Sequence, residues 1–249
     1  MNTQSSLLRL ITVGLVFALG TACANTPSQT SAPTPTPSPP PALTATPTLT
    51  PTTAPTATSA PTATPPVILF QDDFSDPDSG WERYREWDGV LDYEDGGYRM
   101  WINAPSNLFW VNRNLDLVDV CVAVEATKKD GPDANQFGVM CRLDRTTFNY
   151  YAFLIGSDGR YGIGKVIGGT PELIGVGDWQ YSDAINQGSG TNHIRAACVG
   201  DTLTLFVNGQ QLLEVQDGDL LSGDVGLLAG TFDEAGTDIL FDDFTLSEP

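Results

Sequence analysis

The chain has few basic residues and a single histidine, His193. Its 12 lysines and arginines compare with 31 aspartates and glutamates. Arg9 is the only charged residue before Asp72, so the 183 residues from Val67 to Pro249 hold all 31 acidic side chains and 11 of the 12 basic ones, a net charge of −20. Such a surface repels phosphate backbones and anionic headgroups. We therefore expect no nucleic-acid partner, and the charge favours divalent cations or neutral polymers.

The apolar run near the N-terminus is too short to span a bilayer as a helix of the mature chain. It covers the ten residues 10–19 and follows Arg9, which is typical of a secretory signal. The next four residues, Gly20-Thr21-Ala22-Cys23, resemble the lipobox at which bacterial lipoprotein signals are cut. The resemblance implies that residues 1–22 are removed and that Cys23 is diacylated and anchors the protein to the membrane at the cell surface. Ordinary secretory cleavage close by would instead give a soluble secreted protein.

Residues 24–66 contain no charged or aromatic side chain. They hold 13 of the chain's 18 prolines together with many threonines. A segment of this composition cannot build a core, so we expect residues 23–66 to form a lipidated, disordered Pro/Thr stalk. Its length would reach about 130 Å as a polyproline-II rod and about 36 Å as a flexible coil. The threonines could also accept O-linked sugars, although a spacer needs no modification.

Residues 67–249 show no apolar stripe at helical spacing and are long enough for one domain with a sizeable core. Short runs of β-branched and aromatic residues alternate with Gly, Asp and Asn, which predicts an all-β domain. Roughly a dozen strands would suit two packed antiparallel sheets better than a small barrel. Three hairpins are expected: Val90–Ile102 around Asp95-Gly96-Gly97, Tyr150–Val166 around Asp158-Gly159, and Thr202–Leu213 around Asn208-Gly209.

Alternation along the expected strands indicates which faces are buried. Every second residue from Val118 to Val124 is a valine, so these four valines are predicted to share a buried face. Cys121 falls on the opposite, mixed face. Between Phe137 and Leu143 every second residue is again apolar, and one of these residues is Cys141. In another expected strand, Ile194, Ala196 and Cys198 likewise alternate and share one apolar face.

The cysteines can be assigned if the protein is exported. With Cys23 assigned to lipid, three cysteines remain in an oxidising compartment. Cys141 and Cys198 both lie on apolar faces, so we predict a disulfide between them and a free Cys121. Closing this loop of 57 residues would contribute about 4 kcal/mol in the chain-entropy model. The alternative is three reduced, buried thiols.

Three stretches resemble the concanavalin A-like jelly rolls, a group that includes laminin-G-type domains, family 16 glycosidases and 3-keto-disaccharide hydrolase domains. The stretches are Phe70-Gln71-Asp72-Asp73-Phe74-Ser75, the hairpin strand Leu203 to Gly209 with its return strand, and Leu240-Phe241-Asp242-Asp243-Phe244. The resemblance spans most of residues 67–249 and implies a two-sheet antiparallel jelly-roll sandwich. It supports the fold better than it supports any activity.

Family 16 glycosidases place two carboxylates on one strand in a Glu-x-Asp-x-x-Glu pattern. The nearest match is Glu86-Trp87-Asp88, but Leu91 stands where the second glutamate should be, and Gly89 is expected to turn the chain. A Ser-His-Asp site would need His193, which is out of phase with apolar Ile194 and should point into solvent. No catalytic residue is therefore predicted.

Pairs of adjacent aspartates lie near both ends of the domain, and the first and last strands of jelly rolls often meet. Calcium takes such oxygen ligands, and jelly rolls similar to this one often hold a structural calcium. The predicted ligands are Asp72, Asp73, Asp242 and Asp243. The alternative is that these aspartates are solvated parts of an acidic surface.

The run Phe148 to Ile155 is apolar on both faces of its expected strand. One face must therefore be covered or must display aromatic surface, on which sugar rings could stack. The candidate ligand-binding residues are Arg142, Tyr150, Trp179 and Tyr181, which could instead be core or loop-packing residues. We prefer a non-catalytic module that binds glycan or a cell-envelope polymer, and the alternative is a carbohydrate-active hydrolase.

Overall fold

The computed structural model describes residues 66–249, so the predicted signal peptide, Cys23 and the stalk lie outside the described residues. Within this range the chain forms sixteen β-strands and no helix. Their bounds are β1 Ile68–Asp72, β2 Tyr84–Glu86, β3 Gly89–Glu94, β4 Gly97–Ile102, β5 Leu108–Asn112, β6 Val120–Asp130, β7 Asn135–Asp144, β8 Asn149–Ile155, β9 Arg160–Ile167, β10 Thr170–Ile174, β11 Gln180–Tyr181, β12 Asn192–Val199, β13 Thr202–Val207, β14 Gln210–Gln216, β15 Asp224–Thr231 and β16 Thr237–Ser247. Residues 66–249 contain no helix that is long and apolar enough to cross a membrane.

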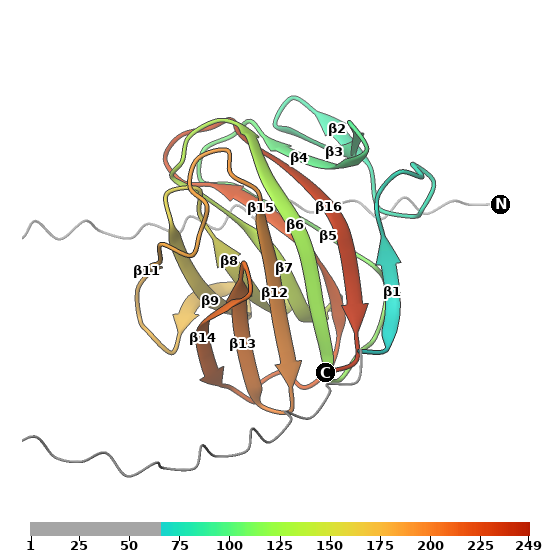
Figure 1. Ribbon diagram of the computed structural model, residues 1–249, viewed down its shortest axis with the longest axis vertical. Coiled ribbons are helices and arrows are strands. Elements are labelled where there is room, and N and C mark those ends of the chain that lie inside the picture. The colour runs from blue at the N-terminus through green and yellow to red at the C-terminus, as the bar shows by residue number, and fades with distance from the viewer. Residues whose placement is uncertain (1–65) are drawn as a thin grey trace, which may run out of the picture. The chain divides into compact units, whose positions relative to one another are not determined.

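The strands form two antiparallel sheets packed face to face, which confirms the predicted sandwich (Figure 1). The nine-stranded sheet has the order β14-β13-β12-β6-β16-β4-β3-β2, and β1 pairs with β16. The seven-stranded sheet has the order β10-β9-β8-β7-β15-β5, and β11 pairs with β9. The sequence predicted about a dozen strands, and part of the difference comes from β2 and β11, which at three and two residues are too short to show an alternating pattern.

All three predicted hairpins are present, as β3–β4, β8–β9 and β13–β14. The Asn208-Gly209 turn has φ angles of 51° and 81°, which is the pair of positive values that a type I′ turn requires. The Asn208 side chain stabilises the turn further, because its Oδ1 accepts a hydrogen bond of 2.9 Å from the backbone N–H of His193. Local turn chemistry therefore set these three registers.

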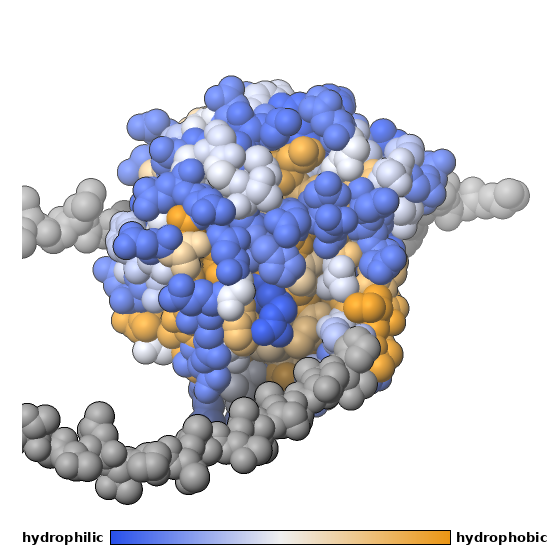
Figure 2. Space-filling model, in the orientation of Figure 1, coloured by the Kyte–Doolittle hydropathy of each residue, from blue (hydrophilic) through white to orange (hydrophobic). Residues whose placement is uncertain are grey.

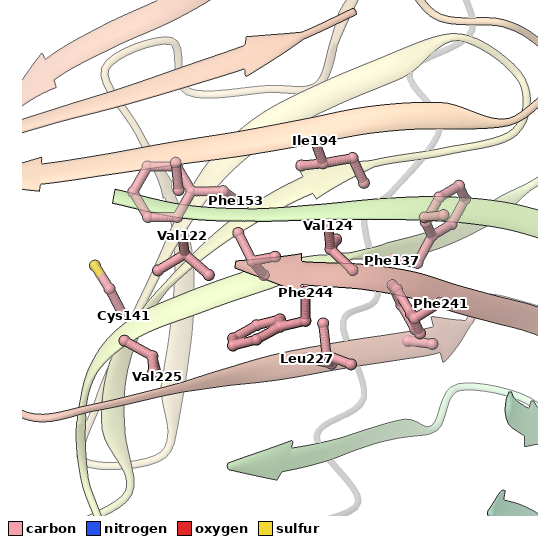
Figure 3. Packing of buried hydrophobic residues seen from close by; sticks show 14 of the residues in the cluster. Val122, Val124, Phe137, Cys141, Phe153, Ile194, Val225, Leu227, Phe241 and Phe244 are labelled. Carbon is pink, nitrogen blue, oxygen red and sulfur yellow. The ribbon is translucent and has the colours of Figure 1, made fainter. Parts of the chain in front are cut away.

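The main core lies between the sheets. Figure 3 shows Val122 and Val124 of β6 together with Phe137, Leu227 and Phe244 from the neighbouring strands and the facing sheet, in a cluster that is almost free of solvent contact. The prediction that Val118 shares this face is wrong. Val118 is 60% exposed, because β6 begins only at Val120 and the preceding residues form a loop.

The disulfide is present as predicted, between Cys141 of β7 and Cys198 of β12. It joins one sheet to the other through the core. Cys121 is free, which is also as predicted. It is buried although it lies on the opposite face from the core valines, because Arg195 lies beside it with Nη1 3.7 Å from Sγ.

The first strand pairs with the last strand, as the resemblance to jelly rolls implied. Ile68 lies opposite Ser247, and Asp72 lies opposite Phe244. Figure 1 shows β1 beside the final part of β16, near the C-terminus. The two ends of the domain, and with them the two aspartate pairs, are therefore neighbours.

Candidate functional site

The outer face of the seven-stranded sheet is apolar. Its strands contribute alternate residues to the main core, so the remaining alternate residues point outward. These residues form a second buried cluster of Met140, Leu143, Tyr150, Ala152, Leu154 and Leu228, and Leu108, Trp110, Val166 and Trp179 pack against it. This sheet is therefore buried on both faces, which is unusual for an antiparallel sheet.

The strand β8 shows this most clearly. Tyr151, Phe153 and Ile155 belong to the main core, whereas Tyr150 and Leu154 belong to the second cluster. The sequence left open whether the second face of this strand is covered or displays aromatic surface, and Tyr150 and Leu154 are both buried. Burial raises the pKa of Tyr150 to about 12, so its hydroxyl stays protonated at neutral pH.

Four side chains meet at one end of this outer face, and we call them the aromatic corner: Arg160, Trp179, Tyr181 and Phe232. Arg160 begins β9, and Tyr181 of β11 lies opposite it in the register. Phe232 directly follows β15. The rings of Trp179 and Phe232 are 6.0 Å apart and nearly perpendicular. The Arg160 guanidinium carbon lies 4.8 Å from the Phe232 ring and 5.9 Å from the Trp179 ring.

The charge in the aromatic corner is balanced. Arg160 Nε donates to both carboxylate oxygens of Asp158, at 2.9 and 2.8 Å. The indole N–H of Trp179 is enclosed and has no acceptor among residues 66–249. Tyr181 is 66% exposed and presents its ring to solvent. The corner therefore combines aromatic surface with a fixed, neutral set of hydrogen-bonding groups.

A second aromatic pair lies on the same outer face, toward β5. The rings of Trp110 and Phe148 are 5.8 Å apart. Trp110 belongs to β5, and Phe148 belongs to the turn between β7 and β8. Phe148 has a positive φ of 56° and precedes β8, so its side chain does not follow the alternation of that strand. Both rings are half-buried.

The structure places three of the four predicted ligand-binding residues on this face. Trp179 and Tyr181 are neighbours in the aromatic corner, and Tyr150 lies in the same apolar cluster as Trp179. Arg142 does not join them. It is 1% exposed, sits at the opposite end of β7, and donates from Nη1 to the backbone oxygen of Leu220 at 2.8 Å.

Arg142 departs from the expected position because β7 is irregular there. Its φ is 55°, and the register with β8 shifts between Cys141 and Asp144. Such a β-bulge redirects the side chain. Burial lowers the pKa of the Arg142 guanidinium, and Asp119 lies 3.7 Å from Nη2. Arg142 therefore ties loops together at the far end of the sandwich.

Sequence patterns did not identify Arg160, Phe232 or Trp110 as members of this face. Asp158-Gly159 marked a hairpin turn, and Arg160 follows it directly, which is the one local signal that was present. Phe232 comes from a strand end 72 positions further along the chain, so only the sheet order brings it to Arg160.

Two carboxylates on and beside this face are already engaged. Asp158 is bound by Arg160. Asp224 accepts hydrogen bonds from the backbone N–H groups of Asn114 and Leu115, at 2.8 and 2.9 Å, and is itself buried. An acid and a base for glycoside hydrolysis would both need access to a substrate. These two carboxylates offer neither.

The pattern Glu86-Trp87-Asp88 spans a hairpin turn. Glu86 ends β2 and lies opposite Gly89, and Trp87 at the turn is 78% exposed. Asp88 accepts a hydrogen bond of 2.7 Å from the Tyr84 hydroxyl. Burial raises the pKa of Tyr84 to about 12, and the hydrogen bond to Asp88 contributes to the rise. Leu91 is a core residue. The turn itself is formed by Trp87 and Asp88, and Gly89 already begins β3, so the strand geometry of the family 16 pattern is absent.

His193 lies on the outer face of the nine-stranded sheet, out of phase with buried Ile194 as predicted. Its Nδ1 is 2.9 Å from Glu125 Oε1, and Glu125 lies opposite it in the register. The surroundings are those of an exposed cross-strand pair.

The four predicted calcium ligands lie close in the fold but do not converge. Asp72 is buried and accepts hydrogen bonds from Trp81 Nε1 and the backbone N–H of Phe74, both at 2.9 Å. Asp73 binds Ser75 instead. No group of three or more His, Cys, Asp or Glu side chains suited to a metal ion occurs among the residues that the structure describes. The calcium site stays a prediction.

Asp242 and Asp243 lie where the pairing of β16 with β6 is irregular. Burial raises the pKa of the Asp242 carboxyl, and repulsion from Asp243, Asp73 and Glu125 raises it further. The two aspartate pairs are therefore near enough to repel each other, which a bound cation would relieve.

No protein-family model matches this chain, and no curated protein matches it. Solved structures are similar in fold. A carbohydrate binding module, CBM66, from Bacillus subtilis superposes with a TM-score of 0.56 at 16% identity, over 68% of this chain and 96% of that one. A Bacillus subtilis protein of unknown function with a galectin-like fold gives 0.56 at 11% identity, over 73% of this chain and 96% of that one.

The GH43 protein BlXynB from Bacillus licheniformis superposes with a TM-score of 0.53 at 16% identity, over 72% of this chain. Only 39% of that longer protein is covered. At these identities the likeness establishes a shared β-sandwich fold and no more.

Proposed function

We propose that residues 67–249 form a non-catalytic module that binds a neutral glycan through the outer face of the seven-stranded sheet. The observation that carries the proposal is the aromatic corner, where Trp179, Tyr181 and Phe232 surround an arginine whose charge is already compensated. Aromatic rings stack on the apolar faces of sugar rings, and a few polar groups then fix the hydroxyls. The fold shared with a carbohydrate binding module supports this proposal.

The charges of the domain favour an uncharged ligand. Arg160 is bound to Asp158, and Arg145, beside the other end of the face, lies 3.8 Å from Asp224. An anionic sugar would therefore meet no unpaired cation on this face, in a domain that is strongly acidic overall. Uronic acids, sulfated glycans and sialic acids are the classes that this arrangement disfavours.

The test is affinity electrophoresis of the purified protein in gels that contain xylan, galactan, mannan, β-glucan or fructan, with polygalacturonate as the anionic comparison. At least one neutral polymer should retard the protein, and Trp179→Ala should weaken that retardation at least about tenfold, given the typical cost of losing an aromatic anchor. Trp87→Ala is the matched control, because Trp87 is exposed on the β2–β3 turn of the other sheet. Equal losses in the two variants would contradict the assignment.

We do not propose a hydrolase. The carboxylates described on this face are engaged in hydrogen bonds, and the structural likeness to GH43 proteins covers less than half of their length. We therefore expect the module to bind a glycan without cleaving its glycosidic bonds.

We also propose that the module is held at the cell surface by lipid on Cys23, with the Pro/Thr segment as a spacer. The support is the sequence pattern at the N-terminus. Cys23→Ala should move the protein from the detergent phase to the aqueous phase in Triton X-114 partitioning. Unchanged partitioning would contradict lipid anchoring while leaving the glycan proposal intact.

A further inference from the structure

We infer that Arg195, on the outer face of the nine-stranded sheet, binds the carboxylate of a sugar acid that stands alone in an otherwise neutral glycan. Arg195 alternates along β12 with the buried residues Ile194 and Ala196, so it points away from the core. The proposed glycan site lies on the outer face of the other sheet and disfavours such sugars. The inference therefore adds a second site with a different ligand class and does not depend on the proposed function.

Arg195 has no acidic partner, although residues 67–249 hold 31 acidic and only 11 basic side chains. Nine of the eleven basic side chains have a carboxylate oxygen within 4.0 Å. The exception besides Arg195 is Arg113, which donates to the backbone oxygen of Ser79 and lies over the rings of Phe70 and Trp81. Arg195 therefore carries a charge that no carboxylate in residues 66–249 compensates at short range.

Phe206 fixes the position of this guanidinium. Arg195 on β12 lies directly opposite Phe206 on β13, and its guanidinium carbon is 3.7 Å from the centre of the ring. Stacking of this kind holds the planar group in place. Nη1 lies 3.7 Å from Cys121 Sγ, and the other N–H groups have no partner in residues 66–249. None of these nitrogens is enclosed without a partner, so the free N–H groups face solvent.

The positions beside Arg195 on this face are small and neutral. Ala123 lies opposite Arg195 on β6, and Thr245 lies opposite Ala123 on β16, which is the next strand of the sheet (Figure 1). Both side chains are half-buried, as Arg195 is. Glu125, the next outward residue of β6, is hydrogen bonded to His193 at 2.9 Å. The charge pairs that cover other parts of this face therefore stop around Arg195.

The geometry fits a single carboxylate. A fixed, planar guanidinium binds a carboxylate through two parallel N–H···O hydrogen bonds. A contiguous polyanion such as polygalacturonate is repelled by the net charge of −20 and by Glu214, which stands exposed on β14 of the same sheet. One carboxylate among neutral sugar rings gains the contact with Arg195 and avoids most of that repulsion.

The test compares methyl β-glucuronide with methyl β-glucoside, which has a hydroxymethyl group in place of the carboxylate. Each sugar is titrated into the full-length protein with Cys23→Ser, and the arginine Nε–Hε signals are followed by NMR. The glucuronide should bind at least about fivefold more tightly than the glucoside and should shift the Arg195 signal. This preference should shrink when NaCl is raised from about 0.05 M to about 0.5 M.

Variants separate the Arg195 contact from the general charge of the domain. Arg195→Gln removes the charge, and Arg195→Lys keeps the charge without the planar fork, so both should lose most of the preference for the glucuronide. Phe206→Leu should weaken the preference, and Phe206→Tyr should keep it. The matched control is Arg85→Gln, which removes one positive charge from the same sheet while Arg83 still holds Asp92. This control should bind as the parent does. Far-UV circular dichroism checks the fold of each variant.

Equal affinities of the parent protein for the two sugars overturn the inference. A loss in Arg85→Gln as large as that in Arg195→Gln also overturns it, because long-range charge would then account for the preference. Trp179→Ala should leave glucuronide binding unchanged, so failure at Arg195 leaves the proposed neutral-glycan site intact. If Trp179→Ala removes the preference and Arg195→Gln keeps it, the carboxylate binds on the other sheet and the inference is wrong.

Discussion

The outer faces of the two sheets differ in chemistry. On the seven-stranded sheet the outward side chains form a second apolar cluster with aromatic rings packed over it. On the nine-stranded sheet they form cross-strand polar pairs, such as the ion pair of Arg99 with Asp238 and the hydrogen-bonded pair of His193 with Glu125. Figure 2 shows the molecule from this second face, which is hydrophilic over its upper and central parts and has apolar patches below. The two sheets of one sandwich therefore present different chemistry on their outer faces.

The difference shows where a binding surface can form on this fold. A face covered with paired charges satisfies its own hydrogen bonds and is well solvated, so it gains little from a ligand. The apolar face leaves aromatic rings half-exposed at its margins, and contact with a sugar would remove more of that area from water.

The largest effect should come from removing apolar volume beneath the seven-stranded face. Leu228 is fully buried in the second cluster, so Leu228→Ala should lower the free energy of unfolding by about 2–4 kcal/mol. Leu240→Ala makes the same change at a half-buried position on the nine-stranded face and should cost less than about 1 kcal/mol. Urea denaturation measures both. Equal losses would show that the two faces do not differ as described.

A smaller effect is expected from the charge pairs of the nine-stranded face. Arg99 donates to Asp238 at 2.8 and 2.7 Å and to Glu94 at 2.8 Å. Arg99→Met leaves the buried Asp238 carboxylate without these bonds and should cost about 1–3 kcal/mol.

The matched control is Arg83→Met, because Asp92 keeps its bond to Arg85. This variant should lose less than about 0.5 kcal/mol in the same urea titration. A larger loss for Arg83→Met than for Arg99→Met would mean that a remaining arginine donor to the carboxylate does not decide the cost.

The pH dependence of Asp242 should be smaller again. Burial, followed by repulsion from Asp243, raises the folded-state pKa of Asp242, so the folded chain binds this proton more tightly than the unfolded chain does. The stability from protonated Asp242 is present below the unfolded pKa of about 3.9 and is lost as the pH rises through the folded value. Asp242→Asn should therefore raise the melting temperature at pH 7 and leave it unchanged at pH 3. A rise of equal size at both pH values would rule out titration of Asp242 as the cause.

The smallest expected effect is that of calcium. Asp72 is engaged by Trp81, which leaves at most Asp73, Asp242 and Asp243 for an ion. If calcium binds there, it should raise the melting temperature slightly, and the rise should be smaller for the double variant Asp73→Asn and Asp243→Asn. Magnesium at matched ionic strength controls for screening. The same rise in parent and variant would assign the effect to the acidic surface as a whole.

Much of the fold was predictable because its signals are local. Asn208-Gly209 fixed a hairpin through the φ angles that its turn requires, and the alternation around Cys141 and Cys198 placed both sulfurs in the core, where they bond. Val118 was misplaced because alternation alone does not show where a strand begins. The run Phe148 to Ile155 indicated a strand that is apolar on both faces, and the structure buries both.

The candidate site was predictable only in part. Trp179 and Tyr181 are close in sequence and meet in the structure, so composition was a sufficient guide to them. Arg142 was misplaced because a β-bulge changed its direction, and a bulge depends on how the partner strand pairs.

The sequence by itself determined that residues 67–249 form an acidic, all-β domain with a Cys141–Cys198 disulfide, because side-chain alternation, turn residues and charge are properties of neighbouring positions. Only the tertiary structure decided that Arg160 and Phe232 join Trp179. These contacts depend on strand order and register across the seven-stranded sheet, which are set by the packing of residues far apart in the chain.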